Sequence, residues 1–344
     1  ISYETQEQNV NTLSGRDVLF NMKPSAMNLE GVTIIAANPG RTEAGARGIE
    51  KQAMNVVNVM SAKAIELSPD ITVANVIQRM SGVTVERNSS GEGQYAILRG
   101  MDKRYNYTLV NGVKIPSPDN KNRFVPLDIF PSEMLDRLEV TKSLTANMEG
   151  DGIGGAVNLI MKDAPSERQF TANLSTGYNA SHNGIEYRNY SSEQTRIGVH
   201  AKLDYSLNDN HKLTWYNGYM DMSEAEVRDG EDEKERAVRM RWNHQYIINS
   251  TLKGEHLFLS GGALRLNWSA VLSKAFSETP DNAEIYLLGS HVSTTDAAKR
   301  RWEHNSDKDK AGYVDLVYKL KFDGGASLDF SAGGMYRDKK RDSF

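Results

Sequence analysis

The feature that most constrains this chain is a period-two alternation of apolar and polar side chains that begins near residue 168. It is regular over residues 197–205, 264–272, 314–322 and 328–336, and shorter runs occupy 170–178, 213–220 and 238–252. Successive side chains of a β-strand point to opposite faces of the sheet. The pattern therefore predicts an antiparallel sheet with one apolar and one polar face.

Two kinds of protein contain such a sheet, a water-soluble β-sandwich and a membrane β-barrel. Several runs approach the length of about ten residues that a strand needs to cross a bilayer. Aromatic side chains gather near the predicted strand ends, as at Trp215, Tyr219 and Tyr336. Tight connections at 207–211 and 323–326 alternate with long charged ones at 221–236 and 278–310. These details favour a barrel, but patterning alone leaves both architectures open.

Composition narrows the function classes. The formal net charge of -4, with 25% charged residues, argues against nucleic acid as a partner, because that surface would be basic. The chain has no cysteine, so disulfide scaffolds and thiolate metal sites are excluded. It begins at Ile1 without a basic and apolar signal segment, so we expect a processed or partial form of a longer protein.

Residues 49–165 have mixed α/β character. Ser61 predicts a capped helix over 62–67, and Thr72 predicts a second helix that ends near Gly82. Asn111 and Gly112 join two apolar runs, which is the strongest short hairpin signal. We also expect a helical tendency over 133–138 and strands at 83–85, 95–98, 138–140 and 156–160.

Three motifs in this segment resemble the plug of TonB-dependent outer-membrane transporters. Residues 98–101, 104–106 and 109–116 are similar to the family block "IRG…RY…LVDGVPI". Residues 135–143 resemble "VERIEVLKGP", and residues 149–162 resemble "YGSGAIGGVINIITK". The usual Gly-Pro of the second block is Ser143-Leu144 here, and the Tyr-Gly pair of the third is Met148-Glu149. These forms resemble a subgroup common in Bacteroidetes-type receptors.

The resemblance implies a domain order and a fold class. Residues 1–28 resemble the tail of a carboxypeptidase-regulatory-like β-sandwich, and 29–48 are expected to hold the TonB box and a flexible linker. An α+β plug at 49–165 would precede the first strands of an antiparallel transmembrane β-barrel at 166–344. A complete plugged barrel of this kind has about 22 strands, and the predicted strands after residue 165 make up about a third of that number.

The resemblance also assigns candidate site residues. The TonB-box candidates are Leu29, Glu30, Gly31, Val32, Thr33, Ile34 and Ile35, because an extended β-branched segment can add a strand to the edge of TonB. The plug–barrel contact candidates are Arg99 and Lys142. The ligand-apex candidates, from the polar turns 88–94 and 117–123, are Asn88, Glu92, Gln94, Asp119, Asn120 and Arg123.

No catalytic residue, cofactor or metal ligand is expected. Gly152, Gly154 and Gly155 lack the Lys-Ser/Thr of a phosphate loop and predict close backbone packing instead. The seven histidines are scattered without a helical pair. The expected function is import of a siderophore, haem, cobalamin, oligosaccharide or peptide through the outer membrane of a Gram-negative, Bacteroidetes-like bacterium. The expected partners are that ligand, TonB with its inner-membrane energising complex and, as a further candidate, a surface lipoprotein. The alternative is a soluble or surface β-sandwich adhesin.

Overall fold

A computed structural model describes residues 39–88, 91–119, 122–146, 148–163, 187–231, 236–259, 263–288, 291–292, 298–322 and 327–344. The chain divides into two units, Ile1–Asn38 and Pro39–Phe344, and every described residue belongs to the second. The expectations for residues 1–28, for the TonB box at 29–35 and for the run at 170–178 therefore lie outside the described residues. No helix in the described part is long and apolar enough to span a bilayer.

The first part of the second unit is an α+β domain. Its helical elements are η1 (Pro39–Arg41), α1 (Glu43–Gln52), α2 (Ala62–Glu66), α3 (Val73–Ile77), η2 (Lys103–Tyr105) and η3 (Ser132–Met134). Its strands are β1 (Val57–Ser61), β2 (Val83–Arg87), β3 (Gly93–Leu98), β4 (Asn106–Val110), β5 (Val113–Lys114), β6 (Leu135–Thr141) and β7 (Gly155–Met161). Five of the strands form a sheet in the order β1-β6-β7-β4-β5, and β2 pairs with β3.

Local signals account for two of these elements. The side chain of Ser61 accepts a hydrogen bond from the backbone N–H of Ala64, so it caps α2 as expected. In the β4–β5 hairpin Val110 pairs with Val113, and the positive φ angles of Asn111 (50°) and Gly112 (80°) are those of a two-residue primed turn. The close packing expected at the glycines is confirmed, because a Cβ at Gly155 would collide with the carbonyl oxygen of Thr141.

Two expectations for this domain are corrected by the structure. The helical tendency expected over 133–138 is limited to the short η3, which ends at Met134. Residues 135–138 begin β6, because pairing with β1 and β7 outweighs local helix propensity. The described end of the expected flexible linker, residues 39–48, forms η1 and the first part of α1 instead. The hydroxyl of Thr42 caps α1, and Arg47 pairs with Glu43 and Glu50 along it, which offsets the cost of Gly45 and Gly48.

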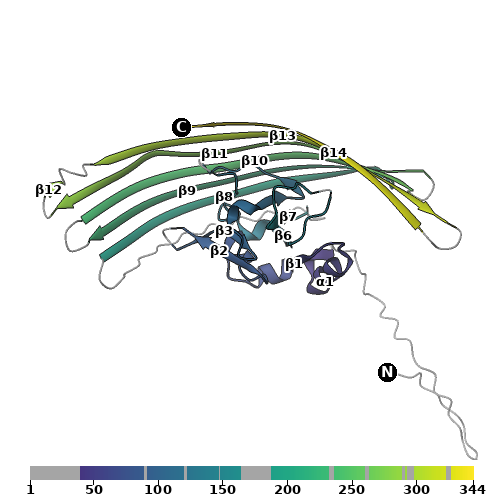
Figure 1. Ribbon diagram of the computed structural model, residues 1–344, viewed down its shortest axis with the longest axis horizontal. Helices are drawn as coiled ribbons and strands as arrows, with labels where there is room; N and C mark the ends of the chain where they lie inside the picture. Colours follow the sequence, from purple (N-terminus) through teal and green to yellow (C-terminus); the bar gives the residue numbers. More distant parts are fainter. Residues whose placement is uncertain are drawn as a thin grey trace, which may run out of the picture. The chain divides into compact units, whose positions relative to one another are not determined.

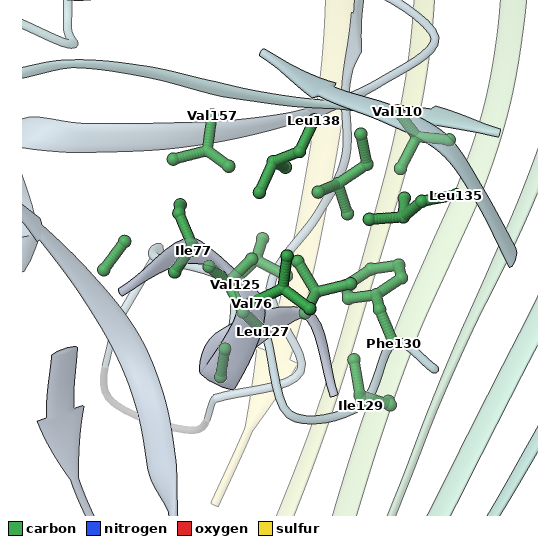
Figure 2. Packing of buried hydrophobic residues seen from close by; sticks show 14 of the residues in the cluster. Val76, Ile77, Val110, Val125, Leu127, Ile129, Phe130, Leu135, Leu138 and Val157 are labelled. Atoms are coloured by element: carbon green, nitrogen blue, oxygen red, sulfur yellow. The ribbon is translucent and has the colours of Figure 1, made fainter. Parts of the chain in front are cut away.

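The domain has its own apolar core between the sheet and α2–α3 (Figure 2). The largest fully buried side chains of this core include Phe130, Ile129, Leu138 and Leu159, each with no exposed area. The segment 124–131, which has no regular secondary structure, contributes Val125, Leu127, Ile129 and Phe130 to it. Apolar burial therefore fixes this segment, and the residues on either side of it, against the sheet.

The second part is one antiparallel sheet of very long strands (Figure 1). Its strands are β8 (Tyr187–Asn208), β9 (His211–Glu231), β10 (Arg236–Phe258), β11 (Leu264–Leu288), β12 (His291–Val292), β13 (Lys299–Lys321) and β14 (Ser327–Ser343). They follow in the order β8-β9-β10-β11-β13-β14, with the two-residue β12 beside β11. Within the described residues the sheet is open, with β8 and β14 at its edges.

The expected long loops at 221–236 and 278–310 are mostly strand. β9 continues to Glu231 and β10 begins at Arg236, while β11 reaches Leu288 and β13 begins at Lys299. Charged side chains pair across these strands, as Arg236 does with Asp229 and Arg239 with Glu226. Since both faces are polar here, the period-two hydropathy signal disappears although the backbone remains extended.

The outer face of the sheet has an apolar band. We define this face by Ile197, Trp215, Leu252, Leu272 and Val314, together with every second residue along the same strands. On β8 the band includes Ile197, Val199, Leu203, Tyr205 and Leu207, all more than half exposed. It spans residues 264–272 on β11 and 328–336 on β14, which is the length of about 9–11 residues that crosses a bilayer. The observed band supports the barrel over the sandwich, because a sandwich would cover these side chains.

Candidate functional site at the apex turns and the inner face of the sheet

The inner face of the sheet is the one that contacts the α+β domain. Tyr216, Met220 and Met222 of β9, Ile247 of β10 and Ala275 of β11 belong to the same buried apolar cluster as the core of the domain. A second apolar cluster joins Val113 of β5 to Val271 of β11 and Ala311 of β13. Hydrogen bonds and ion pairs add to these apolar contacts between the inner face and the domain.

The first apex turn, between β2 and β3, is held by its own backbone. Asn88 donates its N–H to the carbonyl oxygen of Glu92 (2.8 Å), and its side-chain oxygen accepts the N–H of Glu92 (2.9 Å). The Glu92 carboxylate then accepts from the guanidinium of Arg196 on β8 at 2.7 Å. The carbonyl oxygen of Gln94 accepts from Leu127 at 2.8 Å. Glu92 is thus a contact to the sheet as well as an apex residue.

The second apex turn follows β5. The hydroxyl of Ser117 donates to the carbonyl oxygen of Phe124 (2.7 Å) and accepts from the N–H of Asp119 (3.1 Å). The Asp119 carboxylate accepts from the N–H of Asn122 at 2.7 Å. Arg123 is exposed, and Asn120 lies outside the described residues.

The structure brings the two apex turns together through Tyr95. Its phenol donates to the Asp119 carboxylate at 3.0 Å, and its ring meets that of Phe124 edge to face at 4.9 Å. The Lys103 ammonium lies 4.4 Å from the centre of the Tyr95 ring. Burial, together with Asp119, raises the pKa of Tyr95, so its hydroxyl stays a donor at neutral pH.

β13 and β14 hold the second apex turn by its backbone carbonyls. The amide of Asn305, on β13, donates to Pro118 (2.9 Å) and Asp119 (3.3 Å). The guanidinium of Arg341, on β14, donates to Asn122 (2.8 Å) and Asp119 (3.1 Å). Because these bonds go to main-chain oxygens, they do not depend on the side chains of the turn.

A second polar contact centres on Glu149. Its carboxylate accepts from Arg337 of β14 (2.6 Å), from Tyr313 of β13 (3.2 Å) and from Lys114 of the β4–β5 hairpin (3.2 Å). Nearby, Lys253 of β10 donates to the carbonyl oxygen of Asn111. Lys114, Glu149, Lys253 and Tyr313 line a cavity of about 390 Å³ between the hairpin and the sheet.

Arg99 and Lys142 bond to the domain itself. Arg99 donates to the carbonyl oxygens of Ile153 (3.3 Å) and Gly154 (3.2 Å), and its φ of 55° is positive. Lys142 donates to the carbonyl oxygen of Ser81 at 2.7 Å. Their role as contacts to a barrel wall stays a prediction. Other residues of the domain, Glu92 and Glu149 among them, contact the sheet in the described part, and the sequence analysis did not assign them to this contact.

One signal could have identified Glu149. It stands where the third family block has the glycine of its Tyr-Gly pair, so a carboxylate replaces the smallest side chain. A departure of this size needs a compensating partner, and Arg337 supplies one. Asn305, Arg337 and Arg341 had no comparable signal, because they lie where strands were not expected or on polar positions of alternating runs.

Asp128 is a buried carboxylate in the segment behind the apex turns. It is 1% exposed, and neither oxygen has a hydrogen-bond partner among the described residues. Burial raises the pKa of the carboxyl to about 7, although the Arg196 guanidinium opposes the shift. Among the described residues no group of three or more His, Cys, Asp or Glu could hold a metal ion.

Comparisons with known proteins agree with this geometry. The TonB-dependent Receptor Plug Domain family matches residues 49–156. The vitamin B12 transporter BtuB of Photobacterium profundum is 26% identical over 118 residues, which are 34% of this chain and 19% of that protein. The chain thus spans about a fifth of the length of this relative.

Solved structures share the fold. A ferric enterobactin receptor of Pseudomonas aeruginosa, PfeA, in complex with enterobactin gives a TM-score of 0.52 at 16% identity, over 85% of this chain and 50% of that one. The siderophore receptor PirA of Acinetobacter baumannii gives 0.50 at 14% identity, over 84% and 48%. The chain spans about half the length of these structures. Residues 49–156 therefore match the plug domain of TonB-dependent receptors.

Proposed function

We propose that the protein imports a large or scarce nutrient across the outer membrane, driven by TonB. The observation that carries the proposal is that the two faces of the long sheet differ in what they contact. The inner face binds a plug of the TonB-receptor type through apolar and polar contacts, and the outer face has an apolar band of bilayer height. Such a wall separates lipid from a plugged passage, which is what an energised importer requires.

The polar contacts suit a plug that must move. Arg196–Glu92 and Arg337–Glu149 join side chains, and Asn305 and Arg341 bind carbonyl oxygens of the apex turn. Hydrogen bonds of this kind can be exchanged for bonds to water when the plug shifts, so their net cost is modest. In our proposal the ligand binds the apex turns, and TonB then pulls on Leu29 to Ile35.

The adhesin alternative has less support. A soluble β-sandwich would bury the apolar face of its sheet between two layers. Here Leu203 is 60% and Tyr205 66% exposed, whereas Glu226 and Asp307 on the inner face are buried. The polarity of the sheet is therefore opposite to that of a soluble sandwich, and it fits a lipid exterior. No feature of the described residues points to catalysis.

The finer assignments rest on resemblance. We propose the order of a regulatory-like remnant at 1–28, a TonB-box region at 29–48, a plug at 49–165 and barrel strands at 166–344. Siderophore, haem, cobalamin, oligosaccharide and peptide are the candidate ligands, with a surface lipoprotein as a candidate partner. A Bacteroidetes-like source is the proposed origin. Growth of a deletion strain on defined iron and carbon sources distinguishes the ligand classes.

The TonB-box proposal is tested by deleting residues 29–35 from the full-length receptor. We expect loss of binding to the purified C-terminal domain of TonB and loss of growth on the limiting nutrient, with ligand binding at the cell surface retained. A matched deletion of seven residues within 1–28 serves as the control. Unchanged TonB binding after deletion of 29–35 contradicts the proposal, because the β-augmentation segment would then lie elsewhere.

The apex proposal is tested by alanine substitution of Asn88, Glu92 and Gln94 in one variant and of Asp119, Asn120 and Arg123 in another. We expect each variant to weaken binding of the nutrient at least about tenfold if its turn supplies one or two polar contacts. Alanine at the exposed Lys51 and Lys63 is the control. Intact ligand affinity in both apex variants would show that recognition occurs on the strands instead.

A further inference from the structure

The outer face carries a group of lysines immediately beyond the apolar band. The group consists of Lys274 on β11, Lys308 and Lys310 on β13 and Lys340 on β14. The register pairs Lys274 with Lys308 and Lys308 with Lys340, so three ammonium groups share one rung across three neighbouring strands. Like charges directly opposite each other destabilise a sheet, which indicates a compensating anion.

The edge of the band crosses the strands obliquely. It ends at Tyr246 on β10, at Leu272 on β11 and at Tyr336 on β14. Across the sheet, Tyr336 lies level with Leu252 of β10, so the edge of the band on β10 lies six residues away from the level of its edge on β14. A band parallel to the membrane cuts tilted strands in this stepped way. Lys274 and Lys310 are the first outer-face residues beyond this edge on their strands, and Lys308 and Lys340 are the second.

The surroundings of the lysines are those of a membrane interface. The Lys274 ammonium donates to the Tyr246 hydroxyl at 2.6 Å, and the rings of Tyr246 and Phe276 stack at 4.9 Å. Aromatic side chains with one polar group gather at the headgroup level of a bilayer. The lysines therefore lie where lipid headgroups meet the band, and not in bulk solvent.

The acidic side chains around the group do not neutralise it. Asp338 pairs with Lys310 in register, and Asp342 lies 3.8 Å from Lys340, with both side chains well exposed. Lys308 has no ion pair among the described residues. Two carboxylates against four ammonium groups leave the surface basic by two charges.

The side of the membrane follows from the connections. On the side opposite to the lysines, two residues separate Asn208 of β8 from His211 of β9, whereas on the lysine side ten residues separate Leu288 of β11 from Lys299 of β13. The strands continue far beyond the band on the lysine side, where β9 reaches Glu231 and β11 reaches Leu288. Outer-membrane barrels have short turns toward the periplasm, so the lysines face the external leaflet.

We propose that Lys274, Lys308, Lys310 and Lys340 bind the phosphate groups of an anionic glycolipid in the external leaflet of the outer membrane. Ammonium groups bind phosphate as point charges without a fixed geometry, which suits a fluid headgroup layer. The lipid would neutralise the rung and fix the height of the barrel in the bilayer. The proposal requires the membrane placement described above, but not nutrient import.

The test uses the full-length receptor and native mass spectrometry with two probes, bisphosphorylated lipid A and the same lipid after removal of both phosphates. We expect the receptor to retain the phosphorylated form at least about tenfold better. The variant with Lys→Gln at all four positions should lose this preference. The control carries Lys212→Gln and Lys319→Gln, at the opposite ends of the strands, and should keep it.

Two further measurements on the quadruple variant show whether it is folded and whether it still imports the nutrient. Resistance to unfolding in gel-shift assays shows that the quadruple variant is folded, and nutrient import is measured in the same variant to keep failure of the transport proposal distinct. An equal preference for phosphorylated lipid A in the quadruple variant overturns the proposal. Displacement of the bound phosphorylated lipid by millimolar inorganic phosphate would overturn the proposal as well, because the site would then bind free phosphate and not a lipid.

Discussion

The plug and the long sheet place their apolar and polar side chains in opposite ways. The plug buries Phe130, Leu138 and Leu159 at its centre and exposes polar side chains. The sheet exposes Leu203 and Val314 on its outer face and keeps charged groups against the plug. The comparison teaches that hydropathy alone cannot assign inside and outside; the solvent on each face decides which side chains a strand must present.

The largest loss of stability is expected from a cavity in the plug core, and it tests whether the plug and the sheet unfold separately. Phe130→Ala should destabilise the plug by about 3–5 kcal/mol, because the ring is fully buried. Hydrogen exchange of plug amides in the full-length receptor measures the change. Leu203→Ala on the outer face is the control and should leave that exchange unchanged. Equal loss of protection in both variants would mean that plug and wall unfold as one unit.

The next effect concerns Asp128, whose folded pKa is raised above its ordinary value. The folded state then binds its proton more tightly than the unfolded state, so this carboxyl lowers stability as pH rises from about 4 to 7. The slope is at most about 1.4 kcal/mol per pH unit. Asp128→Asn should abolish this part of the pH dependence, followed by exchange of the Leu127 amide between pH 4 and 8. If stability still falls with rising pH in the Asp128→Asn variant, another titratable group causes the dependence.

The apolar band predicts an effect specific to one face. Val314→Lys places a charge in the lipid-facing band and should cost about 2–4 kcal/mol of folding free energy in a bilayer. Asp315→Lys, one residue away on the inner face, should cost much less. Folding into lipid vesicles, followed by gel shift, compares the two. A larger penalty for the Asp315 variant would reverse the assignment of the faces.

The smallest effect probes the polar contact between plug and sheet. The Glu149–Arg337 pair is partly buried, and a double-mutant cycle with Glu149→Gln and Arg337→Gln should give a coupling of about 0.5–3 kcal/mol. The cycle is read from hydrogen exchange of the plug in the intact receptor. A coupling near zero would leave the main-chain bonds of Asn305 and Arg341 as the stronger attachment.

Local chemistry in the sequence was enough to predict the Ser61 cap, the hairpin at Asn111-Gly112 and the strands within the bilayer. It failed where distant pairing decides, as in β6, whose helical tendency yields to strand partners on both sides. It failed again beyond the band, where water wets both faces and charges such as Arg239 and Glu226 pair across strands. The two apex turns were predicted separately, but the Tyr95 hydroxyl that joins them was not.

The length of the strands has a consequence for recognition. β11 has 25 residues, which at about 3.3 Å each span roughly 80 Å, while the hydrocarbon core of a bilayer is about 30 Å thick. Much of the wall is therefore a hydrogen-bonded rim that stands outside the membrane. A ligand that meets such a rim finds side chains whose backbone is already ordered, so little conformational entropy is lost when it is captured.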